Sequence, residues 1–113
     1  MMTNEEIDAL LAQRRYEELY QALQSRKDDP VVSIALGQAA SATGRYAEEL
    51  TFFALANKSM PNFELAAMRY AQALLAHGKR NEARRHFDDA LRRFPNSPRL
   101  TYLKIRLDMA RAA

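Results

Sequence analysis

The sequence predicts an all-α protein built from repeated pairs of helices, and three observations indicate it. Ala, Leu, Arg, Glu and Gln dominate the composition, and only three glycines and four prolines interrupt the 113 residues. No stretch shows the strict alternation of apolar and polar residues that a half-buried strand requires. The chain also repeats itself with a period of 34 residues. We therefore expect helices throughout, arranged as a repeat array.

The repeat is visible when residues 30–63 are aligned with residues 64–97 without a gap. Nine positions are then identical, and the matched Gly, Phe and Pro-Asn are the informative ones, because chance alignment of Ala-rich helices mostly matches alanines. The identical pairs are Gln38 and Gln72, Ala39 and Ala73, Ala42 and Ala76, Gly44 and Gly78, Glu48 and Glu82, Phe53 and Phe87, Ala56 and Ala90, Pro61 and Pro95, and Asn62 and Asn96.

Before these two units, residues 1–29 show the pattern more weakly. Thr3 and Glu6 have the spacing of a capping box, which predicts the start of a short helix. Residues 15–18 echo residues 45–48, but at a distance of 30 and not 34. This first unit is therefore expected to have a shortened second helix or an altered turn.

The first helix of each full unit is expected over residues 31–42 and again over residues 65–76, where apolar residues recur at three- and four-residue spacing. Gly44 and Gly78 follow these runs directly. Glycine ends helices because it adopts the left-handed conformation without a Cβ penalty. A turn is therefore predicted at each of the two glycines.

The second helix of each unit is expected over residues 46–58 and 81–93. Pro61 and Pro95 follow these runs, and the residue before a proline is disfavoured in a helix. The aromatic and large apolar residues of both hairpins are expected to pack between the helices. They are Leu36, Tyr46, Phe53, Tyr70 and Phe87.

After Pro98 the chain carries one more amphipathic run. Leu100, Leu103, Leu107 and Ala110 form an apolar stripe interleaved with charged residues. This mixture is typical of the terminal helix that caps a repeat array.

The order of residue types within each unit resembles the tetratricopeptide repeat family. That family has a large and then a small residue in the first helix, Gly at the turn, small, aromatic and small residues in the second helix, and then Pro. The two units read Leu36-Gly37, Gly44, Glu49, Phe53, Ala56, Pro61 and Tyr70-Ala71, Gly78, Ala83, Phe87, Ala90, Pro95. Glu49 departs from the pattern, because the family places Ala there for close packing, and Arg80 replaces the aromatic residue present as Tyr46.

The resemblance implies an all-α, right-handed α-solenoid of antiparallel helix pairs, with about three repeats and a C-terminal capping helix. We expect a single domain over residues 1–113. Its parts are a degenerate first repeat at 1–29, repeats at 30–63 and 64–97, and the capping helix at 98–113.

The resemblance also implies that the first helices line a concave groove that binds a protein or peptide. The predicted groove residues are Val31, Ile34, Gln38, Leu65, Met68, Arg69, Gln72, Leu75, Tyr102 and Arg106. This row is largely apolar, which indicates an apolar, helical segment of a partner. Family members that clamp a terminal carboxylate present Lys and Asn on this row, whereas this chain has Ile34 and Met68, then Gln38 and Gln72.

We therefore predict a protein–protein interaction module, an adaptor or chaperone. One alternative is a self-assembling structural scaffold, such as a homodimer, whose groove is filled by another copy. In a simpler interpretation the apolar groove residues are core, covered by the chain's own N-terminal helix or by a second copy. A second alternative follows from charge, because residues 76–113 carry ten Lys or Arg against four Asp or Glu. This basic stripe comprises Lys79, Arg80, Arg84, Arg85, Arg92 and Arg93, and it suits nucleic acid or another anionic surface unless it is simply a solvated helix face. The lack of interleaved aromatic residues counts against nucleic acid.

Catalytic residues, metal sites and cofactors are not expected, so the chain is predicted not to be an enzyme. It has no cysteine, and His77 and His86 lack partners at the spacing of a metal site or a catalytic pair. No run approaches the roughly 20 apolar residues that cross a bilayer, and the acidic start does not resemble a secretory signal. We expect a cytoplasmic protein without a membrane span.

Overall fold

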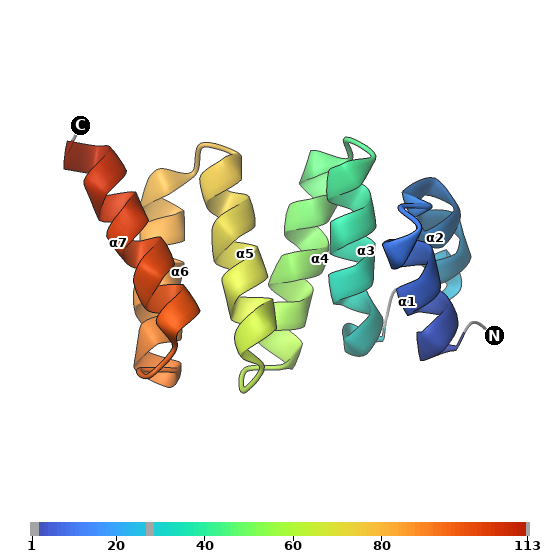
Figure 1. The fold of residues 1–113 in the computed structure, drawn as a ribbon, viewed down its shortest axis with the longest axis horizontal. Coiled ribbons are helices and arrows are strands. Elements are labelled where there is room, and N and C mark those ends of the chain that lie inside the picture. The colour runs from blue at the N-terminus through green and yellow to red at the C-terminus, as the bar shows by residue number, and fades with distance from the viewer. Residues whose placement is uncertain (1–2, 27–28, 113) are drawn as a thin grey trace. The chain divides into compact units, whose positions relative to one another are not determined.

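The computed structural model describes residues 3–26 and 29–112, which form helices and no strand. The chain divides into two compact units, Met1–Met60 and Pro61–Ala113. The first unit contains α1 (Asn4–Ala12), α2 (Tyr16–Leu23), the 3-10 helix η1 (Gln24–Arg26), α3 (Pro30–Ala42) and α4 (Tyr46–Ser59). The second unit contains α5 (Glu64–Ala76), α6 (Arg80–Arg93) and α7 (Pro98–Ala112), and Figure 1 shows these helices. The predicted all-α class is confirmed, while the single domain and its internal boundaries stay a prediction.

The helices of each hairpin, α1 with α2, α3 with α4 and α5 with α6, run antiparallel and are joined by short turns (Figure 1). The glycine turns form as predicted, with Gly44 at φ 79° and Gly78 at φ 77°. Arg14 occupies the same place between α1 and α2, at φ 57°. It lies 30 residues before Gly44, so the turn follows the altered spacing of the first unit.

The three turns share one hydrogen-bond pattern. The backbone N–H of the residue after the left-handed position donates to the carbonyl oxygen five residues earlier, at 2.8 to 2.9 Å. These bonds are Arg15 to Leu10, Arg45 to Ala40, and Lys79 to Leu74. A residue with a Cβ costs roughly 1–2 kcal/mol in the left-handed region. Arg14 therefore destabilises the first turn by about this amount relative to a glycine at the same position.

The first unit also differs in the length of its second helix. Helix α2 has 8 residues, whereas α4 and α6 have 14 each, and η1 follows α2 directly. The start of α1 is capped as predicted, because the Thr3 hydroxyl accepts from the Glu6 backbone N–H at 3.2 Å and the Glu6 carboxylate accepts in return. A short second helix therefore accounts for the shortened repeat.

A continuous apolar core fills the first unit. Buried side chains from α1, α2 and α3 meet there, and Leu19, Leu23 and Leu36 have no exposed surface. The core of the second unit combines small and large residues. The alanines of α5 and α6 allow these two helices to approach, and Phe87, Leu100 and Leu107 fill the space between α5, α6 and α7.

Helices α3 and α4 are in close contact at Gly37 and Phe53. A Cβ atom added to Gly37 would lie 2.5 Å from Cε1 of Phe53, well inside van der Waals contact. The repeat places Ala71 and Phe87 at the corresponding positions of the second unit. The second hairpin therefore accommodates a methyl group that the first excludes.

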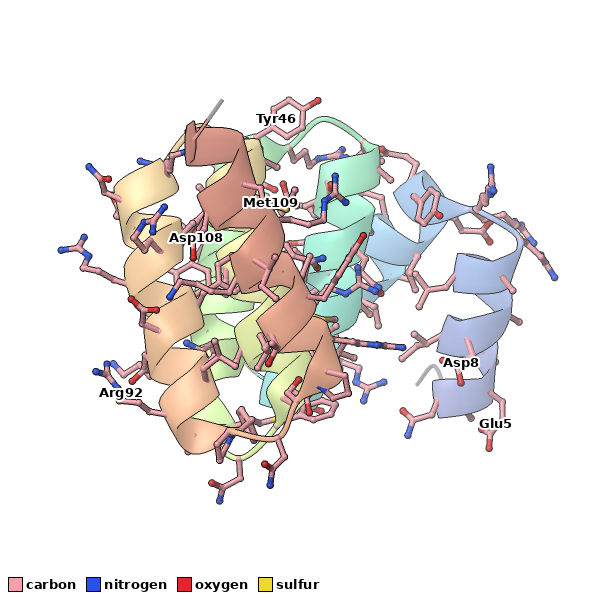
Figure 2. All side chains as sticks on the ribbon, turned by 60° about the vertical axis from the view of Figure 1, so that its left-hand side comes forward. Glu5, Asp8, Tyr46, Arg92, Asp108 and Met109 are labelled. Carbon is pink, nitrogen blue, oxygen red and sulfur yellow. The ribbon has the colours of Figure 1, made fainter. Side chains whose placement is uncertain are left out.

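Most of the residues expected to pack between helices do so, because Leu36, Phe53 and Phe87 are buried. Tyr46 is the exception, since 56% of its surface is exposed. It is the first residue of α4 and extends from the turn end of the hairpin (Figure 2). The packing prediction is wrong for Tyr46 because its position in the first turn of α4 leaves its side chain outside the hairpin core.

Glu49 departs from the small residue that the repeat pattern places at this position. It is nevertheless buried, with 6% of its surface exposed, and the corresponding residue of α6 is the fully buried Ala83.

The contact between α5 and α6 includes a histidine. The rings of Tyr70 and His86 meet edge to face with centroids 4.6 Å apart. Partial burial holds the pKa of His86 below its ordinary value, and the nearby charge of Asp89 opposes that shift. Folding therefore favours the neutral imidazole.

Replacement of Gly37 tests the close approach of α3 and α4. Helix propensity alone predicts that Gly37→Ala stabilises the chain by about 1 kcal/mol. The short distance to Phe53 predicts the opposite sign, a loss of about 1–3 kcal/mol in the free energy of unfolding. Urea denaturation decides between the two, and Phe53→Leu in the Gly37→Ala background should restore part of the loss. A stabilised single variant would contradict the packing.

The pH dependence of stability tests the burial of His86. Its folded-state pKa lies below the unfolded value of about 6.5, so the stabilisation is present above that pH and is lost as pH falls through that value towards the folded pKa. Urea midpoints measured between about pH 7.5 and about pH 5.5 should fall less steeply for His86→Gln than for the natural chain. Equal slopes would show that the histidine titrates alike in both states.

Candidate partner-binding groove

Two adjoining hollows lie in the second unit, between α5 and α7. One has a volume of about 470 Å³ and the other about 250 Å³. Together they are lined by Met68, Arg69, Gln72, Leu75, Ala76, Arg80, Phe87, Arg99, Tyr102, Leu103, Arg106 and Leu107. Gln72 and Leu103 line both, so we treat the two hollows as one site, the α5–α7 groove.

Helical spacing brings these residues to one face of each helix. Met68, Gln72 and Leu75 follow one another at four and three residues along α5. Arg99 and Arg106 are seven residues apart on α7, with Leu103 between them at the same helical register. Residues three, four and seven apart lie on one side of an α-helix, which explains why the two rows face a common space.

The floor of the α5–α7 groove is apolar. Met68, Phe87 and Leu107 are buried, while Leu75 and Leu103 are half-buried and present part of their surface to the hollows. Tyr102 stands at the edge with 59% of its surface exposed. The groove thus offers an aliphatic surface and an accessible aromatic ring to a ligand.

The rim of the groove is cationic. Arg69, Arg80, Arg99 and Arg106 line it, and the lining contains no Asp or Glu. Among the described residues none of these four guanidiniums forms an ion pair, and the Nε of Arg69 is buried without a hydrogen-bond partner. Arg106 lies 5.9 Å from the centroid of the Tyr102 ring. A ligand therefore meets unpaired positive charge beside an apolar floor.

The structure brings together six of the ten predicted groove residues, namely Met68, Arg69, Gln72, Leu75, Tyr102 and Arg106. Ile34 is buried and Gln38 is half-buried in the first unit, and Leu65 is half-buried outside the lining of the two hollows. The side chain of Val31 lies outside the described part of the chain. Partner binding by any of the ten stays a prediction.

Sequence reasoning did not assign Arg99 to the groove, placed Leu103 in the apolar stripe of the capping helix, and placed Arg80 in the basic stripe. The signal for Arg99 and Leu103 was present, because they continue the row of Tyr102 and Arg106 at helical spacing. No comparable signal existed for Arg80, since it is the first residue of α6 and its neighbours depend on how α6 packs.

The remaining residues of the basic stripe have mixed surroundings. Arg84 pairs with Asp108 at 2.6 Å, Arg93 pairs with Asp89 at 3.1 Å, and the Arg93 Nη1 donates to the Pro61 carbonyl at 2.8 Å. Lys79 and Arg85 are exposed, and Arg92 extends outward from α6 (Figure 2), with its guanidinium 3.9 Å from Asp89. Ion pairs therefore compensate part of the stripe. Its role in binding anions stays a prediction.

No group of three or more His, Cys, Asp or Glu is placed to hold a metal ion in residues 3–26 and 29–112. Within the same part of the chain, every helix is too short or too polar to cross a membrane.

Comparison with known proteins gives a family match over part of the chain and a similar fold. Residues 63–107 match the tetratricopeptide repeat family. The structure resembles that of the first tetratricopeptide repeat domain of Spaghetti (RPAP3), solved with a bound HSP90 peptide, with a TM-score of 0.82 and 21% sequence identity. The match covers 96% of this chain and 90% of that one. No curated protein sequence matches the chain.

Replacing Asp108 tests the ion pairs that hold α7 to α6. Asp108→Asn removes the acceptor of Arg84, whose side chain is 23% exposed, and should lower the free energy of unfolding by about 0.5–1 kcal/mol. Asp8→Asn on α1 is the matched control, because Asp8 is exposed and forms no ion pair with another described residue (Figure 2). Equal urea midpoints for the two variants would contradict a stabilising role for the pair.

Proposed function

We propose, from the premise that this chain is a tetratricopeptide-repeat protein, that it is an adaptor or chaperone-like module whose α5–α7 groove binds an apolar, helical segment of a partner protein. The observation that carries the proposal is the aliphatic floor of the groove, open beside the exposed ring of Tyr102. Tetratricopeptide repeats form a protein-interaction fold, and the similar domain of Spaghetti holds a peptide.

A helix suits this groove because it satisfies its own backbone hydrogen bonds before it binds. The lining of the groove has few backbone partners to offer, since it consists of helical side chains. Each aliphatic anchor of the partner that becomes buried on Leu75 or Leu103 contributes roughly 1.5–3 kcal/mol before the entropy cost of ordering. Two or three such anchors contribute roughly 3–9 kcal/mol before that cost, whereas micromolar affinity corresponds to about 8 kcal/mol, so further contacts along the groove must add to the anchors. A cytoplasmic location remains a prediction from the sequence.

A second candidate function is self-association through α7. Tyr102, Ile105 and Met109 are 59%, 51% and 67% exposed, and their spacing of three and four residues places them on one side of the helix. Figure 2 shows Met109 on α7. Such an apolar stripe is a surface that a second copy of the chain would cover.

Truncation of Tyr102 tests the groove as the binding site. The probes are peptides of about 16 residues, or four helical turns, selected by display on the immobilised chain from a library of amphipathic helices. Tyr102→Ala should weaken the selected peptides about 30-fold, which corresponds to about 2 kcal/mol for an aromatic anchor. Fluorescence anisotropy measures the change.

Tyr46→Ala is the matched control for this experiment, because Tyr46 has similar exposure but lies on α4 in the first unit. It should bind the peptides as the natural chain does. A library that yields no helical binder would contradict the proposed function. Sedimentation at the same concentrations should give the mass of one chain, 12.9 kDa. A dimer that Tyr102→Ala dissociates would favour self-association instead.

A further inference from the structure

We infer that the segment bound in the α5–α7 groove is an acidic amphipathic helix, whose apolar residues cover the groove floor and whose carboxylates meet Arg69, Arg99 and Arg106. This inference rests on the proposed function and adds to it the charge of the partner. It is drawn from the way in which the second unit distributes its ion pairs.

The carboxylates of the second unit are engaged away from the groove. Asp88 pairs with Lys104, Asp89 with Arg93, and Asp108 with Arg84, so these pairs join α6 to α7 or lie along α6. The remaining two acids also lie outside the lining. Glu64 accepts a hydrogen bond from the Ser97 hydroxyl at 2.6 Å, and Glu82 is half-buried on α6.

The charged residues of α7 lie on two different sides of the helix, one towards α6 and one along the groove. Lys104 and Asp108 are four residues apart and pair with α6, whereas Arg99 and Arg106 line the groove. Seven residues amount to about two turns, so the two groove arginines lie about 10.5 Å apart along the helix axis. A partner helix with carboxylates two turns apart matches this spacing, and Arg69 on α5 faces it from the opposite wall.

The guanidiniums of the groove gain from such a ligand. They lie around a floor that contains no carboxylate, so an anionic ligand meets positive charge without a competing anion in the lining. Arg69 lines the groove and its Nε has no hydrogen-bond partner, so a ligand carboxylate would give this guanidinium a charge-assisted hydrogen bond and a countercharge. Anionic residues in the partner therefore supply the countercharge that the lining of the groove lacks.

A protein segment fits the groove better than a nucleic acid does, although both are anionic. The floor is aliphatic, and Tyr102 is the one exposed aromatic residue in the lining of the two hollows. Single-stranded nucleic acids bind through successive bases stacked on aromatic side chains, which this lining does not provide. Aliphatic side chains of an amphipathic helix complement Leu75 and Leu103 directly.

The charge of the selected peptides tests this inference. In the display library the apolar stripe is fixed, and each flanking position is drawn in equal proportion from Glu, Gln and Lys. Selection on the natural chain should enrich Glu at positions about two turns apart. Replacing Glu by Gln in a selected peptide should weaken binding about tenfold, and raising the salt concentration should weaken the Glu peptide more than the Gln peptide.

The double variant Arg99→Gln with Arg106→Gln should weaken the Glu peptide about tenfold more than it weakens the Gln peptide, because only the Glu peptide loses charge pairs. The control pair, Arg85→Gln with Arg92→Gln, removes the same charge from exposed positions of α6 outside the groove and should change neither affinity.

The possible outcomes separate this inference from the proposed function. Helical binders with Glu, Gln and Lys in equal proportion would overturn the acidic partner and leave the proposed function standing. Preference for Glu that survives the groove double variant but not the control pair would move the anionic contact to the outer face of α6, and would also overturn it. Displacement of the Glu peptide by a single-stranded oligonucleotide at equal concentration would favour nucleic acid instead. No helical binder at all would contradict the proposed function itself.

Discussion

The left-handed residue at each hairpin turn is the constraint on which the rest of the structure depends. Gly44, Gly78 and Arg14 reverse the chain within three residues, and the hydrogen bond that follows each of them fixes where the next helix begins. That register decides which residues meet across the hairpin, including the contact of Gly37 with Phe53. A helix displaced by one residue would rotate by about 100° and lose this match.

The helices could be predicted closely because Gly and Pro act locally. Gly44 and Gly78 end one helix and Pro61 and Pro95 follow another for steric reasons that need no knowledge of the fold. The observed bounds of α3 to α6 differ from the expected ones by at most one residue. Arg14 could not be predicted in this way, because arginine, unlike glycine, carries a Cβ that disfavours the left-handed conformation and gives no turn signal in the sequence.

The sequence predicts which residues of α5 line the groove, but not which arginines lie in the groove without an ion pair. Helical spacing gathers Met68, Gln72 and Leu75 in the sequence as in the structure. Charge counting, however, treats Arg80 and Arg84 alike, although they are four residues apart on the same helix. One lines the groove unpaired, and the other is held by Asp108 from α7. Which cations are compensated depends on the packing of α6 against α7, which composition does not encode.

Helix α7 differs from α3 and α5 at the position that sets how closely the helices of a hairpin pack. Ile105 lies 34 residues after Ala71 and 68 after Gly37, where α5 and α3 carry small residues. At Gly37 even one methyl group would meet the Phe53 ring, so a branched residue at the corresponding position of α7 is incompatible with the contact that α3 makes with α4. Ile105 is instead 51% exposed, while α7 buries Leu100 and Leu107 in the second unit and leaves Tyr102 exposed at the groove. The leucines of α7, and not the small residue of the repeat, therefore hold this helix in the second unit.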